Sequence, residues 1–152
     1  MILPPDRDLF SLRTPGARSI ADHRALVIPV NRVGAMGAGV AKEARRRFGY
    51  AFAEYTALLA RDALPIGSAV LVRGLIFLPT KQHFRDPYRL EWVDAGLRAL
   101  AQLDLGKLKG VHLPALGCGP GGLSWGDVEP LVRQHLEPSP STFYVYPPEQ
   151  HR

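Results

Sequence analysis

The sequence has one cysteine, Cys118, so no disulfide can form within the chain. Its five histidines lie far apart, without the short spacing typical of a structural zinc site, so no metal is expected. No apolar run approaches the roughly 20 residues of a membrane-spanning helix. The N-terminus, MILPPDRDLF, also lacks the basic start and long apolar core of a signal peptide. These absences predict a cytoplasmic protein without a metal, a disulfide or a membrane partner.

The composition is that of a folded domain. Hydrophobic residues make up 46% and charged residues 22% of the 152 positions, which is close to the globular average. This length fits one domain, residues 1–152. The net charge of +5 and the isoelectric point near 9.7 favour anionic partners such as nucleotides or nucleic acid.

Short β-rich runs alternate with segments of helical spacing. The expected strands are Ala25–Val30, Ala69–Val72, Leu75–Leu78, Val111–Leu116 and Phe143–Tyr146. The expected helices are Gly39–Phe48, Tyr50–Arg61, Leu90–Leu103 and Asp127–Leu136. This alternation predicts an α/β fold with a mixed, mostly parallel sheet and helices on both faces. Ligands of such sheets bind in the loops beyond the carboxyl ends of the strands.

Two of these loops are rich in glycine. Residues 31–39, NRVGAMGAG, run from an apolar strand into a helix, whose free N–H groups and positive dipole end suit a diphosphate. Residues 116–125, LGCGPGGLSW, have the same setting. An ordinary glycine-rich turn is the alternative for the first loop. For Cys118, a small packed thiol is favoured over a nucleophile, because no base stands near it in the sequence.

Two further segments carry charge. Residues 79–85, PTKQHFR, place polar side chains at a strand exit, where they are candidates for reaction chemistry, although Lys81 and His83 would also suit an ordinary surface. Lys42 and the run 45–47 form a basic stretch on the first helix. This stretch would suit nucleic-acid phosphates, but a solvated helix face is the commoner meaning of such a run.

Three segments, 31–49, 79–100 and 113–131, together resemble a macrodomain. The resemblance spans about residues 25–146 and is closer to one branch of the family. That branch contains the DNA ADP-ribosyl glycohydrolase antitoxins of the DarG type and the terminal ADP-ribose protein glycohydrolases. The TK-x-H-aromatic-R segment and GCGxGGLxW favour the DarG side.

The resemblance implies an ADP-ribose site, with the diphosphate between the two glycine loops. Lys81 matches the catalytic lysine, with His83 and Arg85 as possible auxiliary residues. Asn31 would contact the distal ribose, and Asp8 is the position that resembles the family's adenine-binding residue. The other implied ADP-ribose contacts are Met36, Gly37, Ala38, Gly39, Val40, Thr80, Gly117, Cys118, Gly119, Pro120, Gly121, Gly122 and Leu123.

The implied activity is lysine-dependent removal of ADP-ribose from DNA, thymidine-linked and single-stranded, without a cofactor. The implied partners are ADP-ribose, ADP-ribosylated DNA and a cognate ADP-ribosyltransferase toxin. Three alternatives stay open: a protein glutamyl-ADP-ribose hydrolase, a reader that binds ADP-ribose without cleaving it, and a phosphatase acting on ADP-ribose 1″-phosphate.

Overall fold

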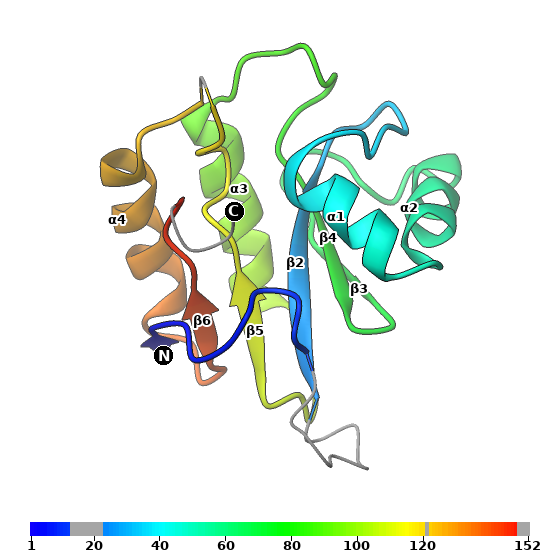
Figure 1. Ribbon diagram of the computed structural model, residues 1–152. Coiled ribbons are helices and arrows are strands. Elements are labelled where there is room, and N and C mark those ends of the chain that lie inside the picture. Colours follow the sequence, from blue (N-terminus) through cyan, green and yellow to red (C-terminus); the bar gives the residue numbers. More distant parts are fainter. Residues whose placement is uncertain (13–22, 121, 149–152) are drawn as a thin grey trace.

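The computed structural model describes residues 1–12, 23–120 and 122–148 (Figure 1). Within these ranges, six strands form one sheet in the order β1-β6-β5-β2-β4-β3. Neighbouring strands are parallel except β3, which is antiparallel to β4. The strands are β1 (Ile2–Leu3), β2 (Arg24–Val30), β3 (Val70–Val72), β4 (Leu75–Pro79), β5 (Gly110–Leu113) and β6 (Phe143–Val145).

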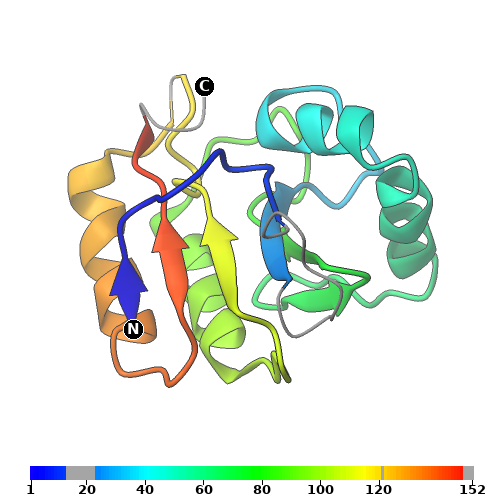
Figure 2. The same ribbon diagram turned by 60° about the horizontal axis from the view of Figure 1, so that its bottom comes forward.

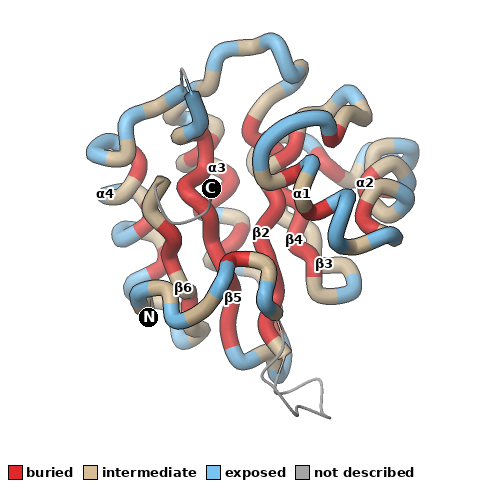
Figure 3. The backbone as a smooth tube through the Cα atoms, in the orientation of Figure 1, coloured by how far each residue is buried: buried red, intermediate tan, exposed pale blue. Residues whose placement is uncertain are grey.

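Two pairs of helices cover the two faces of the sheet (Figures 1 and 2). One face carries α1 (Gly39–Arg47) and α2 (Ala51–Ala60), and the other carries α3 (Leu90–Gln102) and α4 (Trp125–Leu136). Side chains of β2 alternate between the faces: Val27 packs in the α3–α4 core, whereas Leu26 and Ile28 pack in the α1–α2 core. Figure 3 shows β2, β4 and β5 buried along most of their length. The predicted α/β fold, with a mostly parallel sheet between helices, is confirmed.

Element boundaries agree with the sequence to within one or two residues, apart from two differences. The strand predicted to reach Leu116 ends at Leu113, because Pro114 has no N–H to continue the ladder and the buried residues after it form a loop. The short edge strand β1 was not predicted, since two residues carry no periodicity. Among the described residues, no helix is long and apolar enough to span a bilayer.

A polar cluster around buried Arg24 and His112 fastens the N-terminal segment to the sheet. The Arg24 guanidinium donates to both carboxylate oxygens of Asp6, at 2.6 and 2.8 Å. The ring of His112 lies between Arg24 and the N-terminal segment, with Nε2 3.2 Å from Arg24 Nη1 and Nδ1 2.7 Å from the Leu9 carbonyl oxygen. Because a carbonyl only accepts and a guanidinium only donates, His112 is neutral with its proton on Nδ1.

This cluster predicts that the protein loses stability on mild acidification. Burial lowers the pKa of His112 below its ordinary value of 6.5, and Arg24 and Arg7 lower it further. The unfolded chain therefore takes up a proton near pH 6.5 that the folded chain resists, so the free energy of unfolding falls as the pH drops below that value. Denaturation with urea at pH 7 and pH 5 measures the loss. We expect a smaller loss in His112→Gln, and an identical loss in that variant would contradict the assignment.

Candidate functional site

A groove runs along the carboxyl edge of the sheet. It consists of two adjoining cavities of about 840 and 560 Å³, within the range of ligand pockets. Six residues line both cavities, and they come from the end of β2, the start of α1 and the loops after β4 and β5: Pro29, Gly39, Val40, Tyr88, Gly119 and Pro120. In the sheet, β4 lies on one side of β2, and β5, which comes later in the chain, lies on the other side. The groove therefore lies at the point where the strand order reverses.

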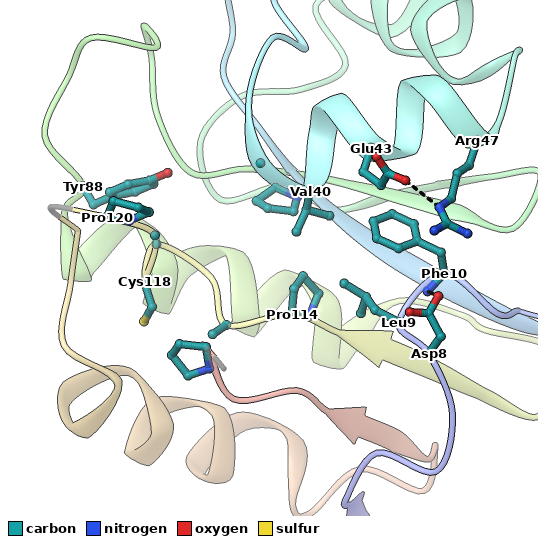
Figure 4. A pocket seen from close by; sticks show the side chains of 16 residues that line it. Asp8, Leu9, Phe10, Val40, Glu43, Arg47, Tyr88, Pro114, Cys118 and Pro120 are labelled. Carbon is teal, nitrogen blue, oxygen red and sulfur yellow. Dashed lines mark hydrogen bonds and ion pairs between the residues drawn. The ribbon is translucent and has the colours of Figure 1, made fainter. Parts of the chain in front are cut away.

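The larger cavity extends toward the N-terminal segment (Figure 4). Figure 4 shows Tyr88 and Pro120 at one end, Asp8 and Phe10 at the other, and Val40 between them. Asp8 accepts a hydrogen bond from the amide of Phe10 at 3.1 Å, which turns the chain at this end of the groove.

The smaller cavity contains the lysine that the sequence singles out. Lys81 is the second residue after the end of β4 and lines this cavity together with Asn31, Thr80 and Phe84. Its ammonium nitrogen lies 3.8 Å from the centroid of the Tyr88 ring and 3.4 Å from the carbonyl oxygen of Phe84. Both the ring face and the carbonyl attract a protonated amine. The lysine thus lies at the end of the groove opposite Asp8.

The loop after β2 is ordered from within by Asn31. The side-chain oxygen of Asn31 accepts from the amides of Val33 and Ala35, at 3.1 and 3.3 Å, and its amide nitrogen donates to the Ala35 carbonyl. The buried hydroxyl of Tyr55, on α2, lies 2.7 Å from both the side-chain and carbonyl oxygens of Asn31 and accepts from the amide of Gly34. Tyr55 therefore supports the loop from behind, a role the sequence did not reveal because α2 is separated from this loop in the chain.

The loop after β5 is a compact glycine turn. Gly117 has a positive φ of 72°, and its carbonyl accepts from the amide of Leu123 at 2.7 Å, while the amide of Gly122 donates to the Gly119 carbonyl at 2.8 Å. A Cβ on Gly122 would lie 2.2 Å from the Gly117 oxygen, so only glycine fits this position as the loop stands.

Cys118 has the character of a packed thiol. Its side chain is partly buried against the α3–α4 core, and its Sγ lies 3.5 Å from the Leu116 carbonyl oxygen. Burial raises the pKa of Cys118 to about 11, so the thiol stays protonated at neutral pH. These observations support the packed role that the sequence favoured over a nucleophile.

The structure brings together most of the residues implied as ADP-ribose contacts. The groove is lined by Asp8, Asn31, Gly37, Ala38, Gly39, Val40, Thr80, Lys81, Gly117, Cys118, Gly119 and Pro120. Five others line neither cavity: Met36, His83, Arg85, Gly122 and Leu123. The side chain of Met36 lies in the α1–α2 core, while Gly122 and Leu123 shape the loop behind the groove. Gly121 lies outside the described residues.

Tyr88 and Phe84 line the groove but were missed from the sequence. Tyr88 lies nine residues beyond the end of β4, where no pattern indicates that the chain folds back onto Lys81.

The basic stretch on α1 is less free than its sequence suggests. The guanidinium groups of Arg46 and Arg47 both donate hydrogen bonds to the Glu43 carboxylate. The Arg45 guanidinium lies 3.8 Å from the centroid of the Phe52 ring. These contacts favour the solvated helix face over a strip of phosphate contacts. Among the described residues, no three histidine, cysteine, aspartate or glutamate side chains gather into a possible metal site.

An α/β sheet with two glycine-rich loops over a groove at its switch point is the arrangement in which open α/β sheets bind their ligands. The sequence profile of the Macro domain family matches residues 27–132. The chain belongs to this macrodomain family.

The chain is similar to proteins named DNA ADP-ribosyl glycohydrolase. The chain is 36% identical over 141 residues to the DNA ADP-ribosyl glycohydrolase of Mycobacterium tuberculosis, an alignment that covers 84% of this chain and 39% of the relative. The Thermus aquaticus protein of the same name is 35% identical over 122 residues, with 74% and 34% covered. The chain thus spans well under half the length of these relatives.

Solved structures of macrodomains are also similar to this chain. The macrodomain of Mycobacterium tuberculosis DarG is 35% identical with a TM-score of 0.81, covering 97% of this chain and 98% of that one. The macrodomain of Thermus aquaticus DarG is 30% identical with a TM-score of 0.79, covering 96% and 97%. The resemblance that the three sequence segments carried is confirmed.

Proposed function

We propose that this protein is a glycohydrolase that removes ADP-ribose from DNA, with thymidine-linked, single-stranded DNA as its substrate. The observation that carries the proposal is a lysine at one end of the groove in a chain 36% identical to a DNA ADP-ribosyl glycohydrolase. The choice of ligand is supported by the structure of Thermosipho africanus DarTG in complex with ADP-ribose. That protein is 26% identical with a TM-score of 0.75, covering 85% of this chain and 39% of that one.

The shape of the groove suggests how ADP-ribose lies in it. Adenine belongs at the end formed by Asp8 and Phe10, and the diphosphate over the start of α1 and the glycine loop at Gly119. The free N–H groups and positive dipole end of α1 favour an anion there. The distal ribose then reaches the smaller cavity, beside Asn31 and Lys81.

This placement puts Lys81 beside the bond to be broken. Hydrolysis cleaves the bond from the anomeric carbon to the base nitrogen: the oxygen of water bonds to the carbon, and the base takes up a proton. In its position against Tyr88, an ammonium on Lys81 stabilises the charge on the leaving base or supplies that proton. In the alternative role, as a nucleophile, the amine must first lose its proton and leave the ring face to form a Schiff base with the opened ribose.

The proposal is tested by incubating the protein with a single-stranded oligonucleotide that carries ADP-ribose on thymidine. We expect mass spectrometry to show the unmodified oligonucleotide and free ADP-ribose. A glutamyl-ADP-ribosylated protein and ADP-ribose 1″-phosphate, treated in parallel, measure the two other hydrolytic activities. Tight binding of ADP-ribose without release from any of the three substrates would instead establish a reader.

A cognate ADP-ribosyltransferase is the proposed partner. A relative in Thermosipho africanus that is named a fusion of DNA ADP-ribosyl transferase and DNA ADP-ribosyl glycohydrolase supports this pairing, at 25% identity over 153 residues. A transferase of this kind would make the substrate that the proposed reaction removes.

A further inference from the structure

We propose that the ring of Phe84 is a stacking platform for the nucleobase that carries the ADP-ribose. This inference rests on the proposed function and goes beyond it by assigning a site to the acceptor base, at the exposed rim of the groove beside Lys81. The chemical class that it selects is a planar, unstacked base of single-stranded DNA.

The exposure of Phe84 is the first observation. Among the described residues, the exposed large hydrophobic residues are Met1, Val33 and Phe84, and residue Phe84 is 50% exposed. Val33 and Phe84 lie on the loops after β2 and β4, which are joined by a hydrogen bond from the Arg32 amide to the Gln82 carbonyl at 3.1 Å. Each of these two joined loops thus exposes one large apolar side chain, but only Phe84 lines the cavity that contains Lys81.

The position of Phe84 relative to Lys81 is the second observation. Phe84 lines the same cavity as Lys81, and its carbonyl oxygen lies 3.4 Å from the lysine nitrogen. When the distal ribose lies beside Lys81, the base attached to its anomeric carbon leaves the cavity at this rim. A half-exposed aromatic ring at that point offers the base a π face, and this recognition tolerates any base identity.

The surroundings of the ring are the third observation. The His83 ring packs against the Phe84 ring, with centroids 4.3 Å apart and planes 32° from parallel. The Arg85 guanidinium carbon lies 5.6 Å from the centroid of the Phe84 ring. An exposed cation beside a stacking ring is the combination that single-stranded nucleic acid binds, through its bases and its phosphates. A glutamyl acceptor has neither a flat base nor a neighbouring phosphate to use there.

The test compares Phe84→Ala, Phe84→Tyr and the wild-type protein on the single-stranded, thymidine-linked substrate. We expect Phe84→Ala to raise KM about ten- to hundredfold, the size of one lost base–aromatic stack, with a much smaller change in kcat. Phe84→Tyr keeps an aromatic ring, so we expect its KM to be close to that of the wild type. Val33→Ala, which trims an exposed side chain on the adjoining loop, is the matched control and is expected to leave KM unchanged.

Calorimetry with free ADP-ribose tests whether Phe84 contributes to the binding of ADP-ribose itself. Equal affinity in Phe84→Ala and the wild type supports the proposal, whereas a matching loss of affinity overturns it by placing Phe84 in the ADP-ribose site. An unchanged KM in Phe84→Ala also overturns the platform while the proposed function stands. If the wild type releases no ADP-ribose from the oligonucleotide, the proposed function fails, and the platform fails with it.

Discussion

Replacing Lys81 by alanine is expected to reduce the release of ADP-ribose from DNA by about a hundred- to ten-thousandfold, the usual contribution of one positioned proton-transfer group. The reason is the position of Lys81 at the end of the groove where the distal ribose is proposed to lie, held by the Tyr88 ring and the Phe84 carbonyl. Single-turnover release from the thymidine-linked oligonucleotide measures the loss, and calorimetry checks that free ADP-ribose still binds.

A matched lysine serves as the control for this substitution. Lys107→Ala removes an exposed lysine from the connection between α3 and β5, which lies at the opposite edge of the sheet from the groove. We expect this variant to keep full activity. Undiminished release by Lys81→Ala would remove lysine dependence from the proposed mechanism.

Borohydride distinguishes the two roles of Lys81. If the amine attacks the ribose, reduction during turnover traps a covalent adduct in the wild type and none in Lys81→Ala, because only a lysine amine can form the Schiff base. If the ammonium acts as an acid or as an electrostatic stabiliser, no adduct forms in either protein. The observed contacts of Lys81 suit the second role without rearrangement.

The second large effect is expected at Gly122, where alanine should weaken ADP-ribose binding at least about tenfold and lower the free energy of unfolding by about 1–3 kcal/mol. The added Cβ would lie 2.2 Å from the Gly117 oxygen and 2.9 Å from the Gly119 oxygen, both backbone atoms of the same loop. Relieving this overlap must move the loop whose residues 117–120 line the groove.

Calorimetry and thermal unfolding measure the two consequences of this change. Gly49→Ala is the matched control, because a Cβ there meets no atom within 4 Å and Gly49 lies between α1 and α2, away from the groove lining. Wild-type affinity and stability in Gly122→Ala would show that this loop does not depend on a close backbone approach.

The sequence predicted those parts of the fold that depend on local residue patterns, such as apolar runs and glycine positions. The buried strands β2 and β4 read as continuous apolar runs because each packs against a helix layer on both faces. The two glycine loops were visible because glycine marks a strand exit that must approach a ligand or turn sharply. The predicted strand end at Leu116 was wrong for a related reason: buried loop residues after Pro114 are as apolar as a strand, so composition alone does not separate the two.

By itself, the sequence determined the α/β alternation and the two glycine loops and, through its resemblance to a macrodomain, singled out Lys81 as the candidate catalytic residue. Only the tertiary structure decided what surrounds that lysine and how the groove is closed. Tyr88 beneath the amine, Tyr55 behind the Asn31 loop and the N-terminal segment fixed by Arg24 and His112 all depend on contacts between distant parts of the chain. Such contacts follow from the order of strands in the sheet, which no local periodicity records.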